Sequence, residues 1–148
     1  MLILIILISL LFTGLGLVFY GASYPWFVYK VVTIHSKDDR YVSAIVTYGP
    51  ASITYELNKE IGANNFMKQR NHHIFAFTNL KAARRFQDSL NYISAVLECK
   101  YNRKDILPIP EFYDPYGLLG GEINPGQHID IFPENTIHLK QLIPIKVV

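Results

Sequence analysis

The chain has little of the chemistry that marks a secreted protein. It contains a single cysteine, Cys99, so no disulfide can form within the chain, and no Asn-x-Ser/Thr glycosylation signal occurs. These absences favour a reducing compartment, or a membrane that faces one, over secretion. Cys99 stands in the apolar stretch ISAVLECKY, so we expect it to be a small, buried side chain.

A nucleic-acid partner has little support either. The formal net charge is only +2, and the strongest basic group, Lys81 with Arg84 and Arg85, has the spacing of a solvated helix face. Proteins that bind nucleic acid normally carry a basic stripe with interleaved aromatic residues. We therefore predict no nucleic-acid partner.

Motifs for catalysis and metal binding are also missing. The chain has no HExxH, Cys-x-x-Cys, Gly-x-Ser-x-Gly or GxxxxGK[ST] sequence. The adjacent His72 and His73 would point to opposite faces of a strand, and His128-x-Asp130 supplies only two potential ligands. We predict no catalytic residues, no metal, no cofactor and no small-molecule substrate. The alternative, a membrane-tethered transferase, would need a pocket around His72, His73 and Glu98.

The one long hydrophobic run stands at the N-terminus. The stretch MLILIILISLLFTGLGLVFY carries no charge, and the first charged residue of the chain is Lys30. Twenty helical residues reach about 30 Å, which is the thickness of the hydrocarbon core of a bilayer. Because the run is apolar on all sides, we predict a single transmembrane helix over residues 1–24.

The residues after this run have the composition of a membrane interface. Aromatic rings with a polar end prefer the headgroup layer, and a lysine beyond them holds the chain end in water. The predicted membrane-interface anchors are Tyr20, Tyr24, Trp26, Tyr29 and Lys30. The positive charges that follow would keep the C-terminal domain on the cytoplasmic, or capsid-facing, side.

A cleaved signal peptide is the competing interpretation of the same segment. Gly21-Ala22-Ser23 offers small residues for a peptidase, but the segment lacks a basic start and its apolar run exceeds the usual length. Cleavage would leave a secreted domain.

Residues 25–148 are predicted to form one soluble α+β domain. Stretches rich in β-branched and aromatic residues predict strands at 26–36, 41–49, 52–57, 73–79, 93–101, 128–132 and 136–148. Residues 80–92 predict one packed helix, with Thr78 or Asn79 as its N-cap. Residues 58–73 are polar and are expected to be a mobile loop. The expected core is one sheet face that carries Val31, Ala44, Val46, Val96 and Leu142.

Residues 106–127 differ in composition from the rest of the domain. They are rich in proline and glycine and show neither a helical nor a strand period. Long irregular segments in small domains are usually functional or held by another molecule. We predict a partner-binding arm with the large apolar side chains of Phe112, Tyr113, Tyr116, Leu118 and Leu119.

The order of these segments resembles a small β-rich domain of unassigned function found in tailed phages and large DNA viruses. The matching residues are Tyr29–Val32, Ser43-Ala44, Phe75–Phe77 with Ala83 and Phe86, Leu97–Cys99 and Leu139–Ile143. The order is also distantly similar to ADP-ribosyltransferase-type folds, although no histidine-tyrosine-glutamate catalytic set is evident. The viral resemblance implies a single-pass minor capsid or virion-membrane protein. Its expected partners are the bilayer, in the virion's internal membrane, and neighbouring capsid proteins.

Overall fold

A computed structural model of the chain describes residues 26–35, 39–44, 46–47, 49–110 and 132–148. Within them lie three helical segments: α2 (Asn65–Gln69), α3 (Leu80–Asp88) and the 3-10 turn η1 (Arg103–Asp105). The strands are β1 (Trp26–His35), β2 (Arg40–Ser43), β3 (Thr54–Tyr55), β4 (Ile61–Gly62), β5 (Ile74–Phe77), β6 (Ser94–Tyr101), β7 (Ile106–Leu107), β8 (Thr136–Leu139) and β9 (Gln141–Val147). The predicted α+β class, a mainly antiparallel sheet with a packed helix, is confirmed.

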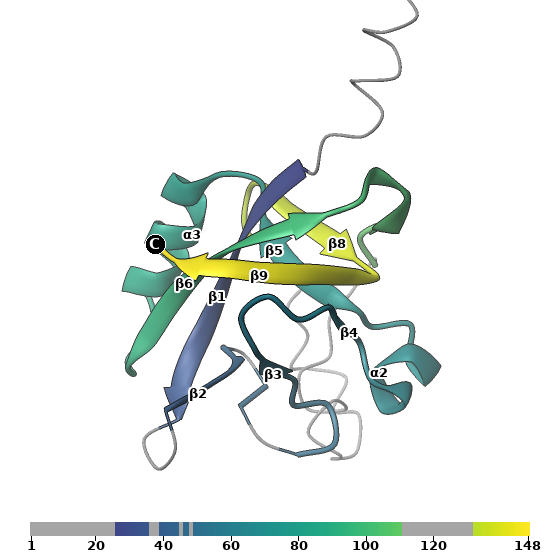
Figure 1. The fold of residues 1–148 in the computed structure, drawn as a ribbon, viewed down its shortest axis with the longest axis horizontal. Coiled ribbons are helices and arrows are strands. Elements are labelled where there is room, and N and C mark those ends of the chain that lie inside the picture. Colours follow the sequence, from purple (N-terminus) through teal and green to yellow (C-terminus); the bar gives the residue numbers. More distant parts are fainter. Residues whose placement is uncertain (1–25, 36–38, 45, 48, 111–131) are drawn as a thin grey trace, which may run out of the picture.

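The long strand β1 lies at the centre of the sheet (Figure 1). It pairs with β6 from Trp26 to Thr33, and on its other side it pairs with β5 near its start and with β2 near its end. Strands β9 and β4 continue the sheet beyond β6, and strands β8 and β7 continue it beyond β5. The strands pair antiparallel throughout the described sheet, and β1, β2 and β3 form a meander at the strands predicted from residues 26–57.

The connection between β8 and β9 shows that the sheet is strongly curved. Only Lys140 separates these two strands, yet three strands, β6, β1 and β5, lie between them in the sheet order. In a flat sheet four strand spacings would be about 19 Å, whereas two Cα steps reach only about 8 Å. The single strand expected at 136–148 is therefore bent at Lys140 into two, whose ends the curvature brings together. The Lys140 amide donates a hydrogen bond to the Asp105 carbonyl oxygen over 2.8 Å.

Curvature divides the core into two clusters. The larger one fills the inside of the curled sheet and includes Val28, Val32, Leu97, Leu139 and Leu142. The smaller one lies between the sheet and α3 and includes Val31, Phe77 and Ala83. Successive side chains of a strand alternate between the two faces, so both faces of β1 and β6 are apolar.

The prediction of a single core face is corrected by this arrangement. All five predicted residues are buried, but Val31, Ala44 and Val96 pack on the side of α3 whereas Val46 and Leu142 point into the curled sheet. Sequence spacing did not separate them, because continuous apolar runs have no alternation to follow.

The loop predicted at residues 58–73 is structured instead. It contains β4, which pairs with β9, and α2, whose N-cap Asn64 accepts a hydrogen bond from the Met67 amide over 3.0 Å. Met67 is buried in the inner cluster. Four apolar residues, Ile61, Ala63, Phe66 and Met67, order this segment, because each of them contacts the inner cluster.

Helix α3 begins at a side-chain cap, as predicted. The Asn79 Oδ1 atom accepts a hydrogen bond from the Ala82 amide over 2.8 Å, and Ala83 faces the sheet. Asn79→Ala removes this bond and should lower the free energy of unfolding by about 1 kcal/mol. Asn79→Asp is the matched control, since aspartate also caps. Chemical denaturation of the full chain in detergent measures both, and equal stability of the two variants would contradict the role of the cap.

Candidate functional site

The chain enters the described domain at an exposed aromatic pair. Trp26 and Phe27 open β1 and are 50% and 46% exposed, although they belong to a strand that is otherwise mostly buried. In the sheet register Trp26 lies opposite Tyr101 and Phe27 opposite Lys100, at the end of β6. Both strand ends lie at the upper edge of the domain in Figure 1. One end of the sheet therefore presents aromatic side chains to the surroundings.

Cations from η1 lie beside this aromatic pair. The Arg103 guanidinium lies 5.9 Å from the centre of the Trp26 ring, and Arg103 and Lys104 are both exposed. An aromatic ring beside a cation is the combination found in headgroup layers. Sequence analysis missed these two residues because they are far from Trp26 in the chain. The pairing of strand 26–36 with strand 93–101 would have revealed them.

Lys30, a predicted interface anchor, lies inside the domain, and this prediction is corrected. It is only 8% exposed, its Nζ donates a hydrogen bond to the Phe75 carbonyl oxygen over 2.8 Å, and it lies 5.7 Å from the centre of the Tyr55 ring. Burial lowers the pKa of Lys30 to about 8, against a smaller opposing effect of Cys99. Side chains of β1 alternate between the two faces of the sheet, and Lys30 lies on the inner face with Val28 and Val32. Its side chain therefore cannot reach the water at the start of β1.

The other predicted anchors have different positions. Tyr29 is half-buried and packs with the α3 cluster, whereas Trp26 is exposed. Tyr20 and Tyr24 lie outside the described residues, as does the transmembrane helix predicted over 1–24. In the part of the chain that the structure covers, no helix is long and apolar enough to cross a bilayer.

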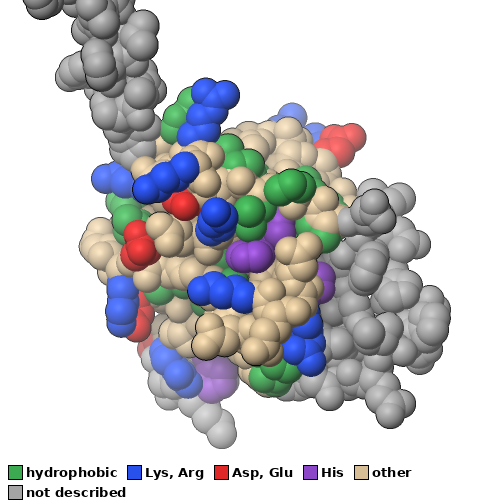
Figure 2. Space-filling view, turned by 90° about the vertical axis from the view of Figure 1, so that its right-hand side faces the viewer, with side chains coloured by type: hydrophobic (Ala, Val, Ile, Leu, Met, Phe, Trp, Pro, Cys, Tyr) green, Lys and Arg blue, Asp and Glu red, His purple; other side chains and the backbone are tan. Residues whose placement is uncertain are grey.

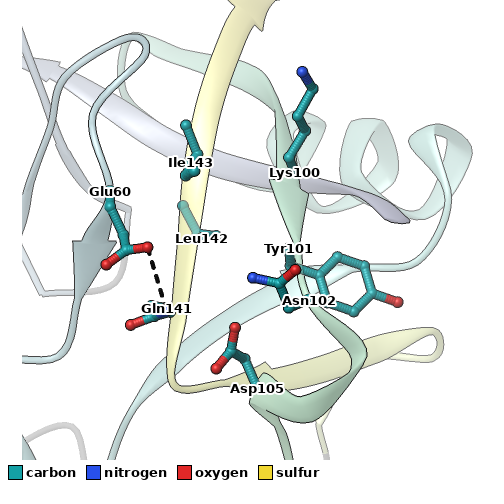
Figure 3. Close-up of a pocket in the computed structure, with 8 residues that line it drawn as sticks. All are labelled: Glu60, Lys100, Tyr101, Asn102, Asp105, Gln141, Leu142 and Ile143. Carbon is teal, nitrogen blue, oxygen red and sulfur yellow. Dashed lines mark hydrogen bonds between the residues drawn. The ribbon is translucent and has the colours of Figure 1, made fainter. Parts of the chain in front are cut away.

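A small pocket opens next to the aromatic end, between the end of β6, η1 and the start of β9 (Figure 3). Its volume is about 110 Å³. It is lined by Glu60, Lys100, Tyr101, Asn102, Asp105, Gln141, Leu142 and Ile143. Figure 3 shows the carboxylate of Asp105 and the amide of Asn102 directed toward the space beside β9, and the ammonium of Lys100 directed away from them.

Asp105 is the most unusual residue of this pocket. It is 5% exposed, and its Oδ2 atom has no hydrogen-bond partner among the described residues. Its position is held by the backbone, because its amide donates to the Asn102 carbonyl oxygen and its own carbonyl oxygen accepts from Lys140. Glu60 accepts a hydrogen bond from Gln141 over 3.3 Å on the other side of the pocket. A buried carboxylate oxygen without a partner is costly, so this pocket is suited to a hydrogen-bond donor or a cation.

A larger cleft of about 540 Å³ lies on another face, beside α2 and β8. It is lined by Arg70, Asn71, His72, Leu107, Pro108, Ile109, Pro110 and His138. Figure 2 shows the side of the molecule that lies on the right in Figure 1. Histidine side chains are visible there among hydrophobic and basic ones. The lining of this cleft contains no serine, threonine, cysteine or acidic residue, so its described part has no hydroxyl, thiol or carboxylate side chain.

His138 is buried at the inner end of this cleft. Its ring stacks on Phe75 with centroids 4.6 Å apart and meets His73 edge to face at 5.3 Å. Burial lowers the pKa of both His73 and His138, so the neutral ring is favoured. In a neutral His138 the Nδ1–H donates to the Pro108 carbonyl oxygen over 2.7 Å. Among the described residues no group of three histidine, cysteine or acidic side chains could hold a metal ion.

The three residues named for a transferase pocket have separate places in the described structure, with His73 lining a small pocket together with Ile74 and Phe75. His72 lines the cleft, but Glu98 belongs to β6 and pairs with Lys146 at 3.4 Å. The predicted partner-binding residues Phe112, Tyr113, Tyr116, Leu118 and Leu119 lie outside the described residues, and so do His128 and Asp130. Cys99 is fully buried, as predicted, and burial raises the pKa of its thiol to about 12.

Comparisons of the chain with models of protein families, with curated proteins and with solved structures found no match.

Proposed function

We propose that this chain is a single-pass, membrane-anchored structural protein whose domain connects a bilayer to neighbouring proteins. The observation that carries the proposal is the aromatic and basic end of the sheet. Trp26 and Phe27 are exposed shortly after the apolar run of residues 1–20, and Arg103 and Lys104 lie on the same end. A bilayer surface would cover these rings and pair these cations with phosphate groups.

The residue order that resembles a viral domain supports a more specific form of this proposal. The neighbouring proteins would then belong to a capsid, and the protein would be a minor capsid component of a virion with an internal membrane. The arm of residues 106–127 stays our prediction for the segment that binds those neighbours. Cross-linking of exposed Lys68 in assembled particles would test it, because α2 lies beside the cleft that Pro108, Ile109 and Pro110 of this arm line. Links to a capsid protein support the role, and links to this chain alone contradict it.

The sole tryptophan of the chain makes the membrane proposal directly testable, because all tryptophan fluorescence comes from Trp26. We expect the full chain in vesicles to resist extraction by high salt and carbonate and to require detergent. We also expect lipids brominated near the headgroup to quench Trp26 more strongly than lipids brominated at the end of the acyl chain, because Trp26 would lie at the interface.

The control moves the tryptophan to the far end of the sheet. Ile93 is 72% exposed just before β6, whose other end is opposite Trp26. Eight residues of strand separate these positions by about 25 Å. The double variant Trp26→Phe/Ile93→Trp should therefore show little quenching by either lipid. Release of the full chain by salt, or equal quenching of both proteins, would refute the proposal.

A further inference from the structure

We infer that the pocket at Asp105 binds the primary ammonium group of an aminophospholipid headgroup. This inference rests on the proposed membrane anchoring and goes beyond it, because it assigns a lipid chemistry to one site. Three features carry it: an unsatisfied buried carboxylate, the size of the pocket and its position at the proposed membrane end.

The first feature indicates a cationic ligand with N–H donors. The Asp105 Oδ2 atom is buried without a partner among the described residues, and Glu60 brings a second carboxylate to the lining. Lys100 is the one basic residue of this lining, and Figure 3 shows its ammonium directed away from Asp105. A ligand that donates hydrogen bonds to a buried carboxylate restores much of what its burial costs.

The second feature separates an ammonium group from other cations. A calcium or magnesium ion needs about six oxygen ligands, and this lining offers only two carboxylates, Asp105 and Glu60, in a part of the chain where no three acidic, histidine or cysteine side chains could hold a metal ion. A quaternary ammonium has no N–H and binds through aromatic faces. A primary ammonium brings three donors. The pocket of about 110 Å³ has room for several water-sized groups, so a small headgroup amine such as ethanolamine fits into it.

The third feature indicates that the ammonium belongs to a lipid. Asn102 and Asp105 are three residues apart around η1 and both line the pocket. Residues three apart in a 3-10 turn share one side. Arg103 and Lys104, between them, are exposed, and Arg103 lies over Trp26. An acidic pocket next to exposed cations matches a headgroup that carries an ammonium and a phosphate.

The experiment is native mass spectrometry of the full chain released from mixed micelles of phosphatidylethanolamine and phosphatidylcholine in equal amounts. The two lipids differ only in the methylation of the amine. We expect phosphatidylethanolamine adducts to exceed phosphatidylcholine adducts by about tenfold, as one charged hydrogen bond would give. Asp105→Asn should abolish this preference, and Glu134→Gln, at an exposed turn away from the pocket, should keep it.

Arg103→Gln separates the two halves of the site. It should weaken the retention of both lipids and leave their ratio unchanged, because Arg103 is a cation beside Trp26 and does not line the ammonium pocket. Protection of the buried Cys99 from a thiol reagent verifies that each variant is folded.

Three outcomes would overturn the inference: no preference in the unchanged protein, a preference that survives Asp105→Asn, or thermal stabilisation by calcium alone that Asp105→Asn abolishes.

Soluble phosphoethanolamine should compete with the lipid. If instead only a lysine-containing peptide of a neighbouring protein competes, the pocket binds a protein ammonium group and the lipid assignment is wrong. A chain that carries the lipid preference in micelles but is released from vesicles by salt would refute the anchoring proposal alone.

Discussion

Replacing Lys30 with methionine is expected to stabilise the domain at neutral pH and to remove a pH dependence from its stability. The pKa of Lys30 is lowered from 10.5 to about 8 by burial. Below pH 8 the folded state therefore carries a buried ammonium whose cost, relative to the unfolded chain, is about 3 kcal/mol. Methionine has a similar length and no charge. It also removes the hydrogen bond to the Phe75 carbonyl oxygen, so the net gain at pH 7 should be about 1–2 kcal/mol.

The sign of the pH effect follows from proton binding. Between pH 8 and pH 10.5 the unfolded chain binds the Lys30 proton more tightly than the folded domain, so the stability of the unchanged protein rises with pH relative to Lys30→Met. The stability difference in favour of Lys30→Met should therefore fall by about 3 kcal/mol across this window, so that at its upper end the variant is the less stable protein. Cys99 acts in the opposite direction above pH 9, because burial raises its folded pKa to about 12. The charge of Lys30 lowers this pKa, so its removal adds to the expected difference between the two proteins and does not cancel it.

Urea denaturation of the full chain in detergent at pH 7, 8, 9 and 10 measures this difference. The matched control is Val31→Ala, at the neighbouring position of β1, which removes buried methyl groups without touching a titratable group. Its effect on stability should be the same at every pH. A difference between Lys30→Met and the unchanged protein that is also constant with pH would contradict the buried, weakly basic state of Lys30.

The second large effect is expected from Leu97→Ala in the middle of β6. Leu97 is fully buried in the inner cluster, between the strands β1 and β9. Truncation there should lower the free energy of unfolding by about 2–5 kcal/mol, through lost burial and the cavity that remains. Since small domains are stable by about 5–15 kcal/mol, this is a large fraction of the total.

Ile93→Ala is the control for this variant. Ile93 precedes the same strand but is 72% exposed, so its truncation should change stability by less than about 0.5 kcal/mol. Thermal unfolding followed by circular dichroism compares the three proteins. If the two variants lose equal stability, β6 is not the centre of the core.

Much of the fold could be predicted from local sequence. The strands at 26–35 and 94–101 and the helix at 80–88 lie where the residue types and the Asn79 cap predicted them. Each of these elements is long enough to show a composition or a period of its own. The short strands β4 and β7, of two residues each, have no such signal. They exist because a neighbouring strand offers hydrogen bonds, which a single sequence does not reveal.

The candidate site depended more strongly on tertiary structure. Trp26 was expected at the interface from its sequence context, and it is exposed at the start of β1. Its neighbour Arg103 could not be predicted, because the two are brought together only by the pairing of β1 with β6. Asp105 stands in a polar stretch of the sequence, so its burial beside β9 could not be predicted from local context.

The sequence by itself determined that a 20-residue apolar run precedes a domain of ordinary composition, that the domain combines strands with a helix, and that its cysteine is buried. These properties follow from residue type and local spacing. The tertiary structure alone decided that Lys30 points inward, that the last strand bends at Lys140, and that Asp105 is enclosed next to the aromatic end. The physical reason is that the direction and burial of a polar side chain depend on which distant strand lies beside it, and that is set by the packing of the whole sheet.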